Sequence, residues 1–324
     1  MPPVMKPEAW VSFITREYLN GFVKNGGSAI KFAAPLDDQA RSRLSNELSS
    51  VATDLGYIVV DVNAANTRVH MIDQIFFRIA EQVPWKSLSE RVIARLAEEK
   101  HLRPPSEGDA PLLQRIAEGN RIEPGSVMME LRPHIEAKVT RERWLSKDFR
   151  IAMTQICLAQ LTGGPDGETT VQVLTDWLSG RNTAKGAVKP YQIFSSIDKT
   201  NARHFIESLL RWIRFAGYTG ILVVLNMARL AMAKNSGDGL IYYRRPAVLD
   251  TYEVLRQFID ETDRLTGCFM VISTDGTFLD DDPLGRGMGI YPALKFRVFD
   301  EIRDRKLVNP MASLIRLSTT EVPQ

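Results

Sequence analysis

The stretch Gly217-Tyr218-Thr219-Gly220-Ile221-Leu222-Val223-Val224-Leu225 carries the strongest fold signal in the chain. Its two glycines favour a tight turn, and five apolar residues follow them without interruption. A short, continuous apolar run is typical of a strand that is buried on both faces. This pattern therefore predicts a parallel sheet that is covered by helices on both sides.

Four further apolar segments outward from this stretch favour strands. They span residues 30–34, 57–62, 268–273 and 312–317. The segments between them show apolar residues at helical spacing, namely 7–24, 39–55, 70–83, 86–100, 111–119, 131–162, 169–178, a helix that follows Asp198, 244–265 and 292–302. Five apolar strands separated by helices predict an α/β fold with a parallel sheet of about five strands.

The middle of the chain lacks strand signals. We therefore predict a helical insertion or subdomain over 86–180, between an N-terminal part of the core at 1–85 and a C-terminal part at 181–324. Composition is that of an ordinary globular protein, with 41 basic and 39 acidic residues and a formal net charge of +2. This balance gives no bulk attraction to nucleic acid, although it leaves room for a local basic face.

No secretory leader and no apolar run long enough for a bilayer is visible in the sequence, which favours a cytoplasmic protein that does not contact a membrane. The two cysteines, Cys157 and Cys268, lie in apolar segments, which favours buried, reduced thiols. The four histidines are scattered without metal-binding spacing, and no metal site and no catalytic residue is predicted.

The first predicted strand is followed by a turn and a helix, which is where a P-loop protein cradles phosphates with glycine amides and a lysine. Here the turn is Ala34-Pro35-Leu36-Asp37-Asp38-Gln39-Ala40-Arg41, with neither glycine nor lysine. Pro35 lacks an amide donor, and Asp37 and Asp38 place negative charge where a phosphate would lie. At the end of the central strand, where acidic residues would hold magnesium, stand Asn226 and Met227.

These positions together form a degenerate nucleotide site. Its residues are Pro35, Asp37, Asp38, Gln39, Ala40, Arg41, Asn226 and Met227.

The second half of the chain resembles the BrxC/BrxD-like ATP-binding proteins of bacterial BREX phage-defence systems. The resemblance is carried by Arg214 to Leu225, by Tyr252 to Asp260, by Gly285-Arg286-Gly287 and by Tyr291-Pro292-Ala293-Leu294. It covers residues 200–317 well and 10–85 more loosely. It implies a P-loop NTPase/AAA-like fold. ATP and magnesium are implied as ligands by the family resemblance alone, because the Walker A and Walker B residue types are missing from this sequence. No cofactor is therefore expected.

Two groups of basic residues stand out. Arg141, Arg143, Lys147 and Arg150 accompany Trp144 and Phe149 on the predicted helix 131–162. Arg244, Arg286 and Arg297 are candidates for contacting phosphate, or for reaching the ATP site of an active neighbour as P-loop oligomers do. On net charge alone, exposed helix faces paired with nearby Glu and Asp are the favoured explanation of both groups.

Joint loss at both ends of the nucleotide site favours a catalytically degenerate subunit of a prokaryotic anti-phage defence complex. Its expected partners are an active P-loop ATPase homologue, other defence subunits or further copies of this chain. Two alternatives stay open. One is an unconventional ATPase that uses Arg41 for phosphate and Asn226 for magnesium, and the other is a sequence-nonspecific DNA-binding module.

Overall fold

The computed structural model describes residues 4–105, 108, 110–232, 234–279, 285–299 and 308–319. The chain divides into two compact units. The first comprises Met1–Arg78 with Thr219–Gln324, and the second comprises Ile79–Tyr218.

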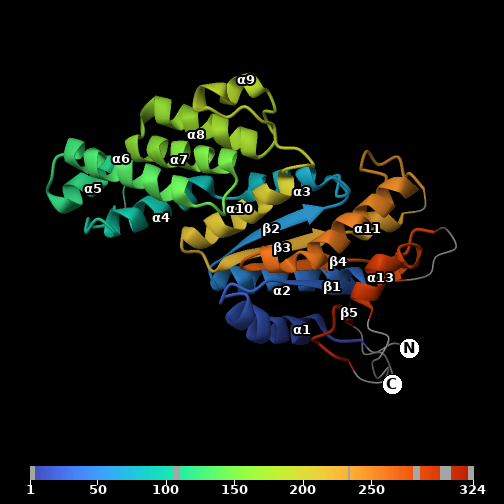
Figure 1. Cartoon of the computed structure of the whole chain (residues 1–324). Helices are drawn as coiled ribbons and strands as arrows, with labels where there is room; N and C mark the ends of the chain where they lie inside the picture. The colour runs from blue at the N-terminus through green and yellow to red at the C-terminus, as the bar shows by residue number, and fades with distance from the viewer. Residues whose placement is uncertain are drawn as a thin grey trace. The chain divides into compact units, whose positions relative to one another are not determined.

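The first unit is built on a five-stranded sheet (Figure 1). Its strands are β1 (Ala29–Pro35), β2 (Tyr57–Asn63), β3 (Gly220–Asn226), β4 (Cys268–Ser273) and β5 (Leu314–Leu317). They lie in the order β2-β3-β4-β1-β5, and every neighbouring pair is parallel. The predicted α/β fold is confirmed, and this sheet is consistent with a P-loop NTPase-like arrangement.

Burial explains why these segments form strands. All residues of β4 are buried, and β3 is buried from Gly220 to Leu225. Apolar side chains of β3 and β4, such as Leu222 and Phe269, belong to one core cluster with Trp10 and Leu48 from the helices that cover this face. Continuous apolar runs are therefore what this central position in the sheet requires.

The helices of the first unit mostly follow the expected segments. They are α1 (Pro7–Ile14), α2 (Asp38–Asp54), α3 (Ile72–Gln82), which crosses the boundary between the units, α11 (Arg245–Asp260), α12 (Gly276–Leu279) and α13 (Pro292–Val298). Short 3-10 turns lie at η3 (Ala228–Ala231), η4 (Thr262–Arg264) and η5 (Met288–Ile290). Part of the predicted helix 292–302 falls on residues 300–302, outside the described residues.

Two predictions for the first unit need refinement. The helix expected over 7–24 changes at Thr15 into a π-helical segment, η1 (Thr15–Phe22), where the Thr15 hydroxyl donates to the carbonyl of Val11 at 2.7 Å. The helix expected over 244–265 ends at Asp260.

The second unit contains α4 (Trp85–Glu98), α5 (Leu112–Asn120), α6 (Pro124–Arg141), α7 (Lys147–Thr162), α8 (Gly164–Leu178), α9 (Lys185–Val188) with the 3-10 turn η2 (Lys189–Tyr191), and α10 (Ala202–Phe215). Helix α7 packs against α4, α6 and α8. Both cysteines of the chain are buried, Cys157 on α7 and Cys268 on β4 of the first unit, and burial raises the pKa of each thiol to about 12.

One helix prediction in the second unit was wrong. Residues 131–162 form two helices, because the chain turns at 142–146 and Ser146 caps α7 by accepting the Phe149 amide at 3.3 Å. The break expected at Gly163–Gly167 is confined to Gly163, whose φ is +67°, and α8 begins at once with Pro165 in its first turn.

Among the helices of the described ranges, none combines the length and the apolar character that a bilayer-spanning segment needs.

Candidate functional site

The register of the sheet brings three strand ends to the same edge. Ser273 at the end of β4 is the Cα partner of Ala33 on β1 and of Asn226 on β3. Ligands of parallel α/β sheets bind outside the carboxyl ends of the strands, where neighbouring connections leave in opposite directions. Here β1 continues into α2, while β3 and β4 lie on one side of β1 and β5 lies on the other. The expected nucleotide site would therefore lie at this edge of the sheet.

Asp37 occupies the N-terminus of α2. It is the N-cap residue, and its Oδ1 accepts the amide of Ala40 at 2.6 Å. The carboxylate also accepts the amide and the hydroxyl of Thr319, at 3.3 and 3.2 Å, and the hydroxyl of Ser318 at 3.4 Å. The Ala40 bond, followed by the bonds from Thr319 and Ser318, holds the pKa of Asp37 below its usual value. The chain's own carboxylate thus sits where a helix N-terminus would otherwise receive a phosphate.

Four positions of this turn, Pro35, Leu36, Ala40 and Arg41, offer no free backbone donor. Pro35 has no amide hydrogen, and the amide of Leu36 donates to the carbonyl of Leu317 at 2.8 Å. The amide of Ala40 is held by Asp37, and that of Arg41 donates to the Asp37 carbonyl at 3.1 Å. The side chain of Leu36 faces solvent, which places an apolar group at the tip of the turn. These four positions therefore do not form the nest of free amides that cradles phosphates in P-loop proteins.

Arg41 reaches from α2 to the end of β4. Its Nη1 lies 3.4 Å from the hydroxyl of Ser273 and 3.2 Å from the carbonyl of Thr274. Both acceptor residues are buried, and the hydroxyl of Thr274 is 3.3 Å from the carbonyl of Ala33, to which it donates. The guanidinium therefore links two strand ends across the edge of the sheet. The carboxylate of Asp38, which is solvent-exposed, lies 4.0 Å from its Nε.

Asn226 and Met227 direct their side chains to local structure. Asn226 Oδ1 accepts the amide of Ala228 at 3.1 Å, which stabilises the turn after β3. The Met227 amide donates to the carbonyl of Ser273 at 2.7 Å, and its side chain is only 2% exposed. Neither residue supplies negative charge for a metal ion. Within the described part of the chain, no group of three or more His, Cys, Asp or Glu residues could hold a metal.

Four further residues lie at this edge, namely Gln39, Thr274, Ser318 and Thr319. Gln39 is exposed, and its Oε1 lies 3.4 Å from the hydroxyl of Thr319, which donates to it. Sequence reasoning gave no role at this edge to Thr274, Ser318 or Thr319, although polar residues directly after apolar strands were a usable signal. Thr319 in particular lies 282 residues from Asp37 in sequence, so that only the sheet shows their contact.

The three candidate arginines also belong to the first unit, and Nη1 of Arg286 lies 3.5 Å from the carbonyl of Leu230 in η3, the turn that follows Met227. Arg286 is buried, and its guanidinium donates to the Tyr243 carbonyl at 2.9 Å and to the Tyr242 hydroxyl at 2.6 Å. Arg244 is exposed at the start of α11.

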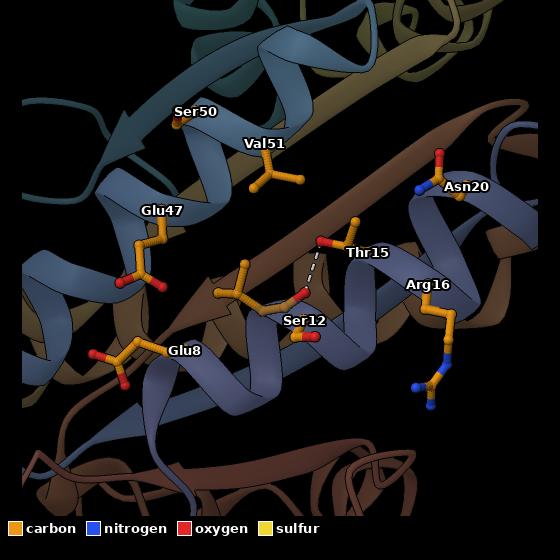
Figure 2. A pocket seen from close by; sticks show the side chains of 9 residues that line it. Glu8, Ser12, Thr15, Arg16, Asn20, Glu47, Ser50 and Val51 are labelled. Carbon is orange, nitrogen blue, oxygen red and sulfur yellow. Dashed lines mark hydrogen bonds between the residues drawn. The ribbon is translucent and has the colours of Figure 1, made fainter.

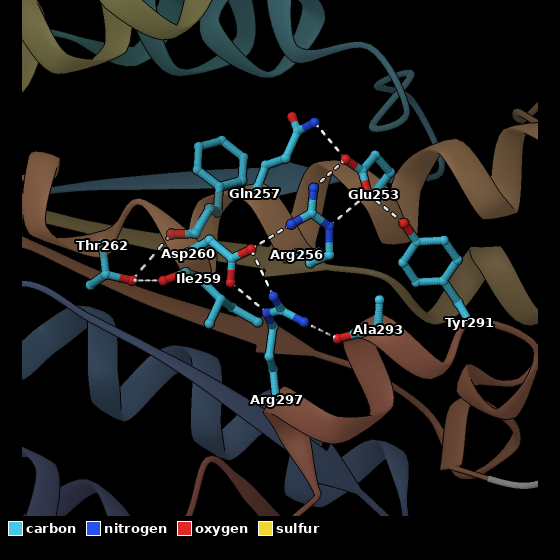
Figure 3. Close-up of polar contacts among 10 residues, drawn as sticks. Glu253, Arg256, Gln257, Ile259, Asp260, Thr262, Tyr291, Ala293 and Arg297 are labelled. Carbon is cyan, nitrogen blue, oxygen red and sulfur yellow. Dashed lines mark hydrogen bonds and ion pairs between the residues drawn. The ribbon is translucent and has the colours of Figure 1, made fainter.

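Arg297 belongs to a network between α11 and α13 (Figure 3). It pairs with Asp260, which also pairs with Arg256 at 2.5 Å, and Arg256 in turn binds Glu253. The bond from Arg256, with smaller contributions from Tyr291 and Gln257, lowers the pKa of Glu253 to about 2. The charges of this network are thus matched by internal partners.

A groove of about 610 Å³ lies between α1 with η1 on one side and α2 on the other (Figure 2). Two carboxylates line it, Glu8 and Glu47, and its cation Arg16 pairs with Glu17 at 2.7 Å. This charge pattern does not suit a phosphate group.

Comparison with known families adds the decisive observation. The family model described as BREX system ATP-binding protein BrxC/D matches residues 114–322, which is more than half of the chain. This chain belongs to the BrxC/D family. The match begins earlier than the resemblance noted in the sequence, includes most of the second unit, and does not extend to residues 10–85. No curated protein and no solved structure matched.

Membership in the BrxC/D family implies a role in phage defence together with other components of a BREX system. The matched residues include β3, β4 and β5, whereas β1, the 34–41 turn and α2 lie outside them.

Proposed function

We propose that this BrxC/D-family chain is a catalytically degenerate P-loop subunit that acts as a scaffold or regulator of an active partner in a defence complex. The observation that carries the proposal is the carboxylate of Asp37 at the N-terminus of α2, held by Ala40, Ser318 and Thr319. A triphosphate placed there would have to displace these bonds and approach a negative charge.

Electrostatics weighs against such a displacement. Two unit charges 4 Å apart repel by about 1 kcal/mol even in water, and by more in a partly buried site. The compensating positive charge, Arg41, already donates to Ser273 and Thr274. In this proposal the carboxylate of Asp37 and the guanidinium of Arg41 take the place of a phosphate and its ligands through bonds within the chain.

Calorimetric titration of the full chain with Mg-ATP tests this proposal. We expect no binding heat at micromolar nucleotide and no phosphate release. Saturable binding in the micromolar range with measurable turnover would refute the proposal. The Asp37→Ala variant is the informative companion, because it removes the internal carboxylate and leaves the adjacent Asp38 in place.

The unconventional ATPase stays the alternative, and one variant separates it from a scaffold. Restoring acidic residues at the end of β3, as in Asn226→Asp with Met227→Glu, is expected to raise turnover if Arg41 and Asn226 already support hydrolysis. For a scaffold we expect the double variant to remain inactive. A buried methionine makes the second substitution costly, so Asn226→Asp alone serves as the folded control.

The proposed partnership has its own test. Co-expression with the products of neighbouring genes, followed by size-exclusion chromatography, should yield a stable complex that contains an intact P-loop homologue. Migration of this chain alone under all combinations would contradict the scaffold role.

A further inference from the structure

The turn between α6 and α7 exposes a tryptophan. Trp144 is 69% exposed, whereas the four other tryptophans of the chain, Trp10, Trp85, Trp177 and Trp212, are at most 7% exposed. Its neighbour Leu145 is buried. Tryptophan combines a large apolar ring with a polar N–H group and is enriched at interfaces for this reason.

The position of Trp144 is fixed by α10. The amide of Ser146 donates to the Ser208 hydroxyl at 2.9 Å, and the guanidinium of Arg211, one turn further along α10, donates to the Trp144 carbonyl at 3.4 Å. The central carbon of this guanidinium, Cζ, lies 5.6 Å from the centroid of the Trp144 indole ring. One face of the indole ring is therefore covered by a cation, and its high exposure leaves the other face open. A flat partner can therefore stack on the exposed indole.

The surroundings of Trp144 are basic. Arg141, Arg143 and Lys147 are exposed, and Arg150 and Arg211 are partly so. The acidic residues of the same segment and of the facing helix are Glu142, Asp148 and Glu207. Asp148 accepts the hydroxyl of Ser195, and Glu207 lies 3.9 Å from Arg211. Within residues 141–150, four basic side chains thus outnumber the two acidic ones, Glu142 and Asp148, and a polyanion would be attracted to them.

A second exposed aromatic residue lies close to this turn. Phe194 is 66% exposed and lines a groove of about 410 Å³ together with Ser146 and Lys147. The groove thus brings Lys147 and Phe194 together, and Asp148 lines it as well. Alternation of aromatic and basic side chains is the pattern with which proteins bind unpaired bases and the phosphates between them.

We propose that the Trp144 surface, formed by Trp144, Phe194, Arg143, Lys147 and Arg211, binds single-stranded nucleic acid. A base stacks on the open face of Trp144, opposite Arg211, and the remaining basic side chains contact phosphates without reading sequence. A duplex keeps its bases stacked on each other and cannot use the indole in this way. All five residues belong to the second unit, so this proposal does not depend on the state of the nucleotide site.

The first test measures binding of the full chain to labelled oligonucleotides of deoxythymidine and of uridine by fluorescence anisotropy at low salt. Tryptophan emission is recorded in parallel, because a stacked base quenches indole fluorescence. We expect Trp144→Ala to weaken binding about tenfold or more and to remove the quenching. Trp144→Phe should keep most of the affinity. Met129→Ala, which truncates an exposed apolar side chain on α6, is the matched control and should leave binding unchanged.

The second test uses salt. Arg143→Glu and Lys147→Glu should each reduce the slope of log K against log salt concentration by about 0.7, as expected for one phosphate contact to a single strand. Arg121→Glu alters an exposed arginine before the start of α6 and should leave the slope unchanged.

Three outcomes would overturn the proposal. They are an absence of binding to both oligonucleotides at low salt, tighter binding to a duplex of the same length than to the single strand, and equal affinities of Trp144→Ala and the unaltered chain. Because Trp144 is exposed, its variants are expected to fold, and a thermal unfolding curve confirms this before binding is compared.

Discussion

The β1–α2 turn and the α6–α7 turn use charged side chains in opposite ways. In the β1–α2 turn, Asp37 and Arg41 form hydrogen bonds with residues of the same unit, at the position where a P-loop protein would hold a phosphate. In the second, Arg143 and Lys147 are exposed around Trp144. The difference teaches that a motif position predicts a ligand only when its groups remain available to solvent.

The largest expected effect is the difference between Phe149 and Trp144 in how much their truncation lowers the free energy of unfolding. Phe149 is fully buried and packs against Trp85, Phe205 and Trp212, with ring centroids 6.1–6.4 Å apart. We expect Phe149→Ala to lower the free energy of unfolding by about 3–5 kcal/mol, because a cavity remains. Trp144→Ala should change it by about 0.5 kcal/mol or less. Chemical denaturation measures both, and similar losses would contradict the assignment of Trp144 as a contact residue.

The next effect concerns Asp37, the N-cap of α2. Removal of the cap in Asp37→Ala should lower the free energy of unfolding by about 1 kcal/mol, within the range of 0.5–2 kcal/mol for N-caps. Asp38→Ala is the control, since its exposed carboxylate is the neighbouring negative charge in the same turn. Equal effects of the two substitutions on urea denaturation would show that charge, and not capping, matters at this position.

The pH dependence of Asp37 sharpens the same point. Its pKa is lower in the folded chain than the usual 3.8, chiefly through the Ala40 amide. The unfolded chain therefore binds the proton more readily, and the stability that Asp37 contributes is present above pH 3.8 and is lost as pH falls toward the folded pKa. The difference in unfolding free energy between the unaltered chain and Asp37→Asn should shrink over that window. A constant difference would contradict the bonds of this carboxylate.

The smallest expected effect on the free energy of unfolding comes from breaking an ion pair that is exposed to solvent. In the network of Figure 3, Arg297 pairs with Asp260 at the surface. Exposed ion pairs contribute little, so Arg297→Met should change the free energy of unfolding by about 0–1 kcal/mol. Thermal unfolding at low and high salt measures it. A loss well above this range would mean that the network holds α13 against α11 more strongly than its exposure suggests.

Some features could be predicted from the sequence because they depend on local patterns. Continuous apolar runs such as 221–225 and 268–273 identified buried strands, since only a covered sheet accommodates them. The missing glycines and lysine of the 34–41 turn were equally visible, as were the residues that carry the family resemblance. The sequence did not reveal the turn at 142–146, because its residues fit helical spacing and the capping role of Ser146 competes with it.

The amino-acid sequence by itself thus determined the α/β class, the strands and the absence of P-loop residue types, all of which follow from nearest-neighbour chemistry along the chain. Only the tertiary structure decided the order β2-β3-β4-β1-β5, the contact of Asp37 with Thr319, and the exposure of Trp144 beside the buried Phe149. These depend on which distant segments pack together, and burial and hydrogen-bond partners are properties of that packing rather than of any local pattern.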